Sequence, residues 1–260
     1  MNLSYLLLDP TGNITLLVET PVPVDLHPAA ARQLMALEPR AEQVGFVSLS
    51  DEGPFLRMAG GEFCGNAALS SAAWYLLRTG RSAGTVSVRV SGTEEPVPVS
   101  IDSLAGGRWR GTVDMPRPLS ADREIFPDGR SLPVIRFPGI AHVILEETMD
   151  RKAAEALAPQ WCAHLGTEAL GLMFLDRTRE TLRPLVYVPA ADTLFWESSC
   201  ASGTTAVGAF LALKAGSPVD LALSEPGGTL SIAAEPSGRL LLSGYVQLLQ
   251  SRTAVFDLQA

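Results

Sequence analysis

Two cysteines begin two similar segments of the sequence. The first segment reads CGNAALSSAAWYLLRTG from Cys64 to Gly80, and the second reads CASGTTAVGAFLALKAG from Cys200 to Gly216. Both have a cysteine, then small or polar residues, an apolar run rich in Ala and Leu, a basic residue and a closing glycine. An apolar run of this kind that ends at a glycine predicts a helix. We therefore expect each cysteine at the start of a helix.

A cysteine at a helix start has a distinctive chemical environment. Unpaired backbone N–H groups and the positive end of the helix dipole lie beside it. This environment should lower the thiol pKa and make a thiolate available near neutral pH, and the same N–H groups can bind a carboxylate. Two such helix starts, facing each other across a pseudo-twofold axis, would hold one carboxylate and place one sulfur on each side of the bound molecule.

That arrangement suits the inversion of a stereocentre through a carbanion. One base removes a proton from one face, and a second acid delivers a proton to the opposite face. Cys64 and Cys200 are the predicted pair. A single cysteine at a helix start can also be a small buried hydrophobe, but two at matched positions favour the catalytic interpretation. The alternative belongs to another class of protein: a non-catalytic, redox-sensing relative in which the two opposed thiols form a disulfide.

The third cysteine has no counterpart in the first half of the chain, and we expect Cys162 to be structural. Cys162 and His164 are close in sequence, but no second pair completes a ligand set for a metal. No metal site is therefore predicted.

The remaining sequence predicts an α+β protein rich in strands. Helices are expected at 27–38, 64–79, 150–165 and 200–215, and Pro159 should break or kink the third. Short runs of Val, Ile, Leu and Thr between turn residues predict strands. They include 85–91, 97–101, 109–115, 141–147, 170–175, 182–188, 219–224, 229–233 and 239–249.

The repeat extends beyond the two cysteine segments. PTGNITLLVET at 10–20 is echoed by FPGIAHVILEET at 137–148, and an alternating strand pattern follows each helix. Three matches in the same order indicate an internal repeat. We expect two halves, 1–117 and 118–260.

The composition excludes several classes of protein. The 260 residues have a formal net charge of −8 at pH 7, with 47% apolar and 18% charged residues. This composition is typical of globular proteins, and a pI near 4.9 argues against nucleic-acid binding. No run approaches the roughly 20 apolar residues of a membrane span, and the N-terminus has no signal-peptide pattern. With three cysteines, we expect reduced thiols and a cytoplasmic protein without nucleic-acid or membrane partners.

The motifs around these residues resemble those of the diaminopimelate epimerases. They are TGN at 11–13, GEFCGNA at 61–67, GIAH at 139–142, SCASGTTA at 199–206 and PGGTLSI at 226–232. The resemblance covers essentially the whole chain. It implies two pseudo-symmetric halves, each a curved, mostly antiparallel sheet wrapped around a central helix, with the active site in the cleft between them. It also implies that the last strand returns to the first half and that neither pyridoxal phosphate nor metal is used.

The resemblance also implies roles for individual residues. Cys64 and Cys200 would be the two acid–base groups. Asn13 would lie near the substrate's α-amino group, although a turn residue is an equal alternative. His142 would lie at the edge of the cleft or form a structural hydrogen bond. The α-carboxylate would be held by backbone N–H groups around Gly65, Asn66, Ala201 and Ser202.

The chain departs from diaminopimelate epimerases where those enzymes bind the distal end of their substrate. The stretch 54–61 lacks their Asn, Ile140 replaces a second Asn, and 188–196 lacks their Arg. A zwitterionic distal end would lose its buried partners. The side-chain pocket is therefore expected to differ.

MAGGEFCGN and SCxSG resemble a divergent branch, the cofactor-independent histidine racemases that supply opine-type metallophore synthesis. A pocket with Phe55, Trp196 and an acidic group, Glu62 or Glu197, would suit an imidazole. Surface or helix-cap roles are the alternative for the two glutamates. We thus expect a histidine racemase, with diaminopimelate epimerase or a racemase of another amino acid as the alternative. The expected partners are an amino-acid substrate and, as in many family members, a second copy of the chain.

Overall fold

The computed structural model describes residues 1–50, 52–191 and 193–256, and the chain divides into two compact units. Unit 1 contains residues 1–114 together with the residues from 243 onward, and unit 2 runs from Met115 to Leu242. The first boundary lies close to the expected residue 117. The C-terminal segment belongs to unit 1, because its strand pairs antiparallel with the N-terminal strand.

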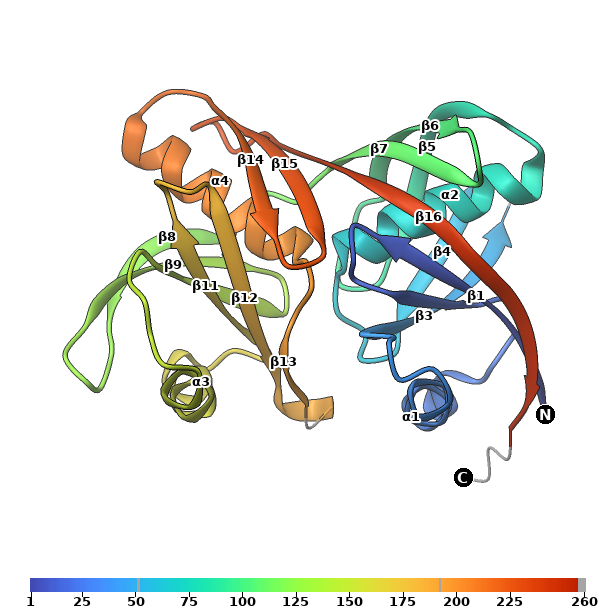
Figure 1. Cartoon of the computed structure of the whole chain (residues 1–260), viewed down its shortest axis with the longest axis horizontal. Helices are drawn as coiled ribbons and strands as arrows, with labels where there is room; N and C mark the ends of the chain where they lie inside the picture. The colour runs from blue at the N-terminus through green and yellow to red at the C-terminus, as the bar shows by residue number, and fades with distance from the viewer. Residues whose placement is uncertain (51, 192, 257–260) are drawn as a thin grey trace. The chain divides into compact units, whose positions relative to one another are not determined.

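Unit 1 is a closed barrel of eight strands. The strands pair in chain order from β1 to β7, and β16 lies between β7 and β1, which closes the ring (Figure 1). The strands are β1 (Asn2–Pro10), β2 (Thr15–Val18), β3 (Gln43–Ser50), β4 (Gly53–Met58), β5 (Ala83–Val90), β6 (Val97–Leu104), β7 (Arg108–Asp114) and β16 (Leu240–Val255).

The helix α2 (Gly65–Thr79) is the core of this barrel and packs against all seven strands from β1 to β7. Small residues in α2 allow close approach, and Gly111 on β7 does the same from the strand side. A Cβ atom at Gly111 would lie 2.4 Å from Cδ1 of Leu69. The second helix of the unit, α1 (His27–Leu37), follows the short 3-10 helix Val24–Leu26 and packs on β3. There the ring of His27 stacks on Phe46 at 3.6 Å.

Unit 2 repeats the plan around its own helix. The strand order is β8-β9-β10-β11-β12-β14-β15, followed by the start of β16, and β13 pairs with β12. The helix α4 (Ala201–Ala215) packs against β9, β10, β11, β14 and β15, while α3 (Arg151–Leu165) packs on β11 and β12. The strands are β8 (Ser120–Ile125), β9 (Ser131–Phe137), β10 (Ile140–Leu145), β11 (Leu170–Asp176), β12 (Thr181–Val188), β13 (Thr193–Trp196), β14 (Val219–Glu225) and β15 (Gly228–Ala234).

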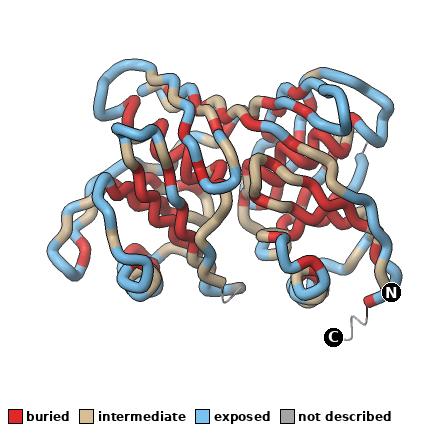
Figure 2. The backbone as a smooth tube through the Cα atoms, viewed as in Figure 1, coloured by how far each residue is buried: buried red, intermediate tan, exposed pale blue. Residues whose placement is uncertain are grey.

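The internal repeat extends to strand direction. In unit 1 the pairings from β1 to β5 alternate between antiparallel and parallel, and β5–β6 is antiparallel. In unit 2 the pairings β9–β10, β10–β11, β11–β12, β12–β14 and β14–β15 follow the same alternation. Buried residues follow the strands and the central helix in each unit (Figure 2).

The four predicted helices and the predicted strands are confirmed, with two differences. Pro159 does not break α3, because the buried Ala158 and Trp161 keep both turns packed although one backbone hydrogen bond is lost. Over the residues that the structure describes, seven strands form outside the predicted ranges: β1 to β4, β9, β13 and, at 120–125, β8. The residues of β8 are mostly exposed, so the apolar pattern of a strand is weak there. No helix in the described part of the chain has the length and apolar composition needed to cross a membrane.

Candidate active site

Cys64 begins α2 as predicted. It is the N-cap residue in an extended conformation, and its sulfur accepts a hydrogen bond from the backbone N–H of Ala67 at 3.4 Å. Its carbonyl oxygen accepts from Ala68 at 2.9 Å. At the other end of the helix, Gly80 adopts the left-handed conformation, with φ of 67°. The local sequence thus fixes both ends of the helix and places the thiol at its N-terminus.

The thiol of Cys64 also donates a hydrogen bond to a residue far away in sequence. Its sulfur lies 2.9 Å from Oε1 of Gln43. The Nε2 group of Gln43 donates to Oδ1 of Asn13 at 2.5 Å and to Oγ1 of Thr15 at 2.7 Å. The Nδ2 group of Asn13 in turn donates to Oε2 of Glu42 at 2.6 Å. Asn13 is therefore linked to the Cys64 thiol through the side chain of Gln43.

This network fixes the orientation of the Gln43 amide. Because its nitrogen already has two acceptors, its carbonyl oxygen faces the sulfur of Cys64. A carbonyl acceptor favours the thiol over the thiolate. No local motif in the sequence marks Gln43 or Glu42 as a site residue. The parallel pairing of β2 with β3, which sets Thr15 beside Gln43, brings them to the site.

The loop before Cys64 carries the Glu62 carboxyl group. Burial raises the pKa of Glu62, while backbone N–H groups and the charge of Arg57 oppose the shift. Its Oε2 atom is buried and has no hydrogen-bond partner among the described residues. Gly60 leaves room for this oxygen, since a Cβ atom there would approach it to 2.5 Å. After Cys64, Gly65 and Asn66 are buried in the first turn of α2.

Cys200 is likewise the N-cap residue of α4 in an extended conformation, but its side chain makes no cap hydrogen bond and its surroundings differ. The residue is buried, and its carbonyl oxygen accepts from the backbone of Thr204 at 2.8 Å. The Ser202 hydroxyl lies 3.7 Å from its sulfur. The buried carboxyl group of Glu225 forms hydrogen bonds with this first turn. Oε2 of Glu225 accepts from the backbone N–H of Cys200 at 2.8 Å, and Oε1 accepts from the hydroxyl of Thr204 at 2.5 Å.

The ionisation of Cys200 differs from the expectation. A helix start was expected to lower its pKa, but the structure raises it well above the ordinary value. Burial is the largest cause, followed by the charges of Glu197 and Glu225 and a hydrogen bond with Glu197, while Ser202 opposes the shift. The pKa of Glu225 is itself raised to about 8, chiefly by burial. Two nearby carboxyl groups and desolvation therefore outweigh the helix dipole.

The expectation that His142 lies at the edge of the site or forms a structural hydrogen bond needs correction. His142 is completely buried on β10, and neither ring nitrogen has a hydrogen-bond partner among the described residues. Burial lowers its pKa to about 3. The ring fills space above Gly171 on β11, where a Cβ atom would lie 2.2 Å from Nδ1. It is a core residue of unit 2.

Of the two aromatic residues expected beside an imidazole, Trp196 already contacts other side chains of unit 2. Trp196 has the guanidinium groups of Arg151 and Arg183 over its ring at 4.9 and 5.0 Å, and its indole N–H donates to Glu155 at 2.8 Å. Phe55 on β4 is 38% exposed. Glu197 follows Trp196 directly, and its backbone N–H donates to the carbonyl of Pro184.

Cys162 lies within α3 rather than at a helix start, unlike Cys64 and Cys200. It is buried, its thiol donates to the carbonyl of Thr167 at 3.3 Å, and burial raises its pKa. Within the described ranges, no three His, Cys, Asp or Glu side chains gather in a way that could hold a metal ion.

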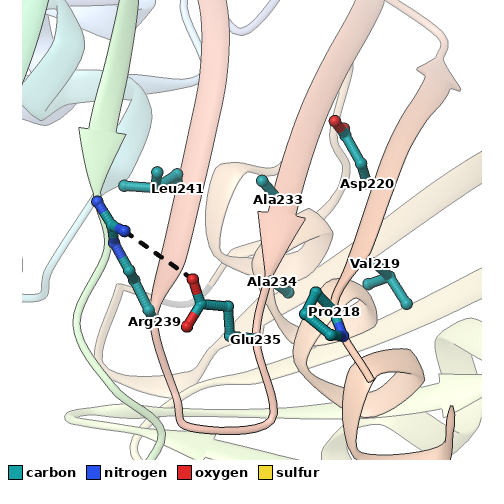
Figure 3. A pocket seen from close by; sticks show the side chains of 8 residues that line it. All are labelled: Pro218, Val219, Asp220, Ala233, Ala234, Glu235, Arg239 and Leu241. Atoms are coloured by element: carbon teal, nitrogen blue, oxygen red, sulfur yellow. Dashed lines mark ion pairs between the residues drawn. The ribbon is translucent and has the colours of Figure 1, made fainter. Parts of the chain in front are cut away.

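A shallow pocket of about 220 Å³ lies elsewhere on unit 2. It is formed by the start of β14, the end of β15 and the start of β16, and Arg239 and Glu235 form an ion pair of 3.9 Å there (Figure 3). Neither Cys200 nor Glu225 lines it. This pocket is therefore separate from the residues around Cys200.

Comparisons with known proteins point to one family. The family model described as "Histidine racemase CntK N-terminal domain" matches residues 2–248. A histidine racemase of Fusobacterium nucleatum subsp. nucleatum is 30% identical over 95% of this chain and 94% of its own length. A histidine racemase of Staphylococcus aureus is 29% identical over 87% of this chain and 86% of its own length.

Solved structures show the same fold at lower identity. A predicted epimerase from Pseudomonas aeruginosa has a TM-score of 0.71 at 18% identity and covers 98% of this chain and 99% of its own. A probable proline racemase from Agrobacterium radiobacter K84 has a TM-score of 0.71 at 14% identity and covers 98% of this chain and 93% of its own. Taken with the sequence matches, this places the chain in the histidine racemase family, as an isomerase that racemises an amino acid.

Proposed function

We propose that this racemase interconverts L-histidine and D-histidine with Cys64 and Cys200 as its two acid–base groups. The observation that supports this most directly is the repeated cysteine at the N-cap of α2 and of α4, in a chain that is 30% identical to a histidine racemase. Two equivalent groups suit a racemase, because the reverse reaction exchanges their roles.

The proposed step moves one proton at each face of the α-carbon. A thiolate at one cysteine removes the α-proton, and the electron pair of the C–H bond remains on the carbon as a carbanion. The thiol at the other cysteine then delivers its proton to the opposite face. At the end, the first cysteine is a thiol and the second a thiolate, so the protein is ready for the opposite enantiomer. Side chains and backbone groups carry out the whole step, without pyridoxal phosphate or metal.

The carbanion needs stabilisation at the adjoining carboxylate. We propose that this group binds to backbone N–H groups, as the resemblance to the diaminopimelate epimerases implies. The first turns of α2 and α4 would contribute backbone N–H groups there. Asn13 would bind near the α-amino group, in support of which it is linked to the Cys64 thiol through Gln43. The N–H donors are those around Gly65, Asn66, Ala201 and Ser202.

The imidazole would be recognised by an acidic group near one of the cysteines. The Oε2 atom of Glu62 supports this role, since it is buried two residues from Cys64 without a partner among the described residues. Glu197 is the corresponding candidate near Cys200. Of the two, Glu62 has the stronger support, because Glu197 already hydrogen-bonds with the Cys200 thiol. A metallophore pathway that consumes D-histidine, and a homodimeric state, complete the proposal.

The substrate is tested by α-proton exchange in deuterated water. The reduced protein is incubated with L-histidine, L,L-diaminopimelate and a panel of other L-amino acids, and the α-proton signal is followed by NMR. We expect the signal of histidine to decay and chiral chromatography to show D-histidine. Exchange on diaminopimelate alone would contradict the histidine assignment, and no exchange on any amino acid would favour the redox-sensing alternative.

The acid–base pair is tested by conservative substitutions. Cys64→Ser and Cys200→Ser should each reduce racemisation by at least about 10³-fold, because a serine hydroxyl is a far weaker acid than a thiol. Cys162→Ser is the matched control and should keep most of the activity. Circular dichroism checks that all three proteins fold. Full activity in Cys64→Ser would rule out the two-base mechanism.

A further inference from the structure

A buried carboxyl group forms hydrogen bonds with the first turn of α4. Glu225 ends β14, is 6% exposed, and binds the backbone N–H of Cys200 with one oxygen and the Thr204 hydroxyl with the other. From these contacts we infer that Glu225 is the positioning residue of Cys200: it holds the N-cap in place and its charge controls how readily the thiol ionises. This inference rests on the proposed acid–base role of Cys200.

The contacts of Glu225 explain why it acts through Cys200. Both of its oxygens are engaged within the first turn of α4, one on the backbone of the N-cap residue and one on Thr204. Holding the N-cap backbone fixes where the Cα–Cβ bond of Cys200 points. Within the same turn, a Cβ atom at Gly203 would lie 3.1 Å from the Cys200 sulfur. The sulfur is thus confined within a turn that Glu225 anchors.

The charged groups around α4 identify the carboxylates that matter. The pKa of the Cys200 thiol is raised by burial and by the charges of Glu197 and Glu225. The elements packed against α4 carry few other titratable groups. His142 is uncharged in the core, and β15 carries none. Arg136 on β9 bonds with the Leu165 carbonyl and Glu124, Asp176 on β11 pairs with Arg179, and Asp220 on β14 is exposed.

Two buried acids that share one turn disfavour a charge on both. The pKa of Glu225 is raised to about 8, and that of Cys200 lies well above its ordinary value. Loss of the Glu225 proton therefore makes the thiolate of Cys200 harder to form, and removal of the carboxylate should make it easier. A purely structural carboxylate would not have this second effect.

The test measures the thiol directly. The chain has three cysteines, so a Cys64→Ser/Cys162→Ser protein contains only the Cys200 thiol, whose ionisation is followed by the ultraviolet absorbance of the thiolate. Glu225→Gln keeps the size of the side chain and an acceptor for the Cys200 N–H. We expect it to lower the thiol pKa by about one unit or more. The matched control is Glu235→Gln, which removes a charge at the opposite end of the β14–β15 hairpin and should leave the titration unchanged.

A thiol pKa in Glu225→Gln equal to that of the single-thiol parent would overturn the inference. If Glu225→Gln fails to fold, Thr204→Val tests the same charge. It removes a hydrogen bond that favours the Glu225 carboxylate, so Glu225 stays neutral to higher pH and the thiol should titrate at lower pH. An unchanged titration in that protein would then overturn the inference. Since the measurement uses no substrate, failure of the wild-type chain to exchange histidine would refute only the proposed function.

Discussion

Gln43 and Glu225 give the two cysteines different surroundings. The Cys64 thiol donates to a neutral amide, whereas Cys200 lies above a buried carboxyl group and beside Glu197. The Gln43 carbonyl accepts from the Cys64 thiol while the Ala67 N–H donates to the same sulfur, whereas charge and burial favour the thiol at Cys200. A bound substrate whose carboxylate and ammonium groups reorganise these contacts would change that balance at each sulfur separately.

The pH dependence of stability should report the buried His142. Burial lowers its pKa to about 3 from an ordinary 6.5, so below 6.5 the unfolded chain binds a proton that the folded chain does not. Stability is therefore lost as pH falls below 6.5. The loss attributable to His142 should reach about 2 kcal/mol near pH 5. His142→Leu should remove this part of the pH dependence in urea unfolding, because leucine has a similar volume and no proton to bind.

The wild-type chain, unfolded in urea at the same pH values, is the reference for this comparison. If His142→Leu lost stability with acid as steeply as the wild-type chain, the burial of an uncharged imidazole would not be the cause.

At the scale of elements, the local sequence determined where the helices begin and end, but not which distant residues contact their first turns. The cysteine caps and the glycines at positions 80 and 216 are local signals, and α2 and α4 begin and end where those signals lie. Gln43 and Glu225 could not be found in this way. The parallel register of β2 and β3 brings Gln43 to Cys64, and the tertiary position of β14 brings Glu225 to Cys200. Both depend on pairings between distant segments.

The packing of α4 on β11 should be sensitive to a single methyl group. A Cβ atom at Gly203 would lie 2.1 Å from the sulfur of Met173, which is fully buried. Gly203→Ala should therefore cost about 1 to 3 kcal/mol of stability through overpacking. Met173→Ala creates space at the same point, so the double variant should lose less stability than the two single variants combined. Urea unfolding of the four proteins measures this, and purely additive losses would contradict the contact.

At the scale of the whole molecule, one strand completes unit 1 with residues from the far end of the sequence. β16 pairs with β1 over nine positions and contacts β7 on its other edge, so the first and last segments of the chain fold together. The repeat in the sequence indicated two halves but could not show where the last strand pairs. That pairing was expected only from the family resemblance, since the strand pattern alone is compatible with either unit.

The contribution of β16 can be tested at two neighbouring residues. Val246 is fully buried opposite Pro10, while Tyr245 is 39% exposed. Val246→Lys would bury an unpaired charge in the barrel and should cost about 3 kcal/mol or more. Tyr245→Lys removes a partly exposed ring that the Arg108 guanidinium contacts at 4.6 Å, and it should cost less than Val246→Lys. Thermal unfolding compares the two proteins, and equal losses would show that β16 does not present Val246 to the core.

The two-base mechanism is tested most directly by the position of the isotope during early turnover. L-Histidine is incubated with the reduced protein in deuterated water, and the two enantiomers are separated and analysed by mass spectrometry before equilibrium. We expect deuterium at the α-carbon of D-histidine from the first turnovers, while the remaining L-histidine keeps its proton, because a different group supplies the new proton. Deuterium entering both enantiomers at equal rates, or D-histidine that retains the original proton, would contradict a mechanism with Cys64 and Cys200 on opposite faces.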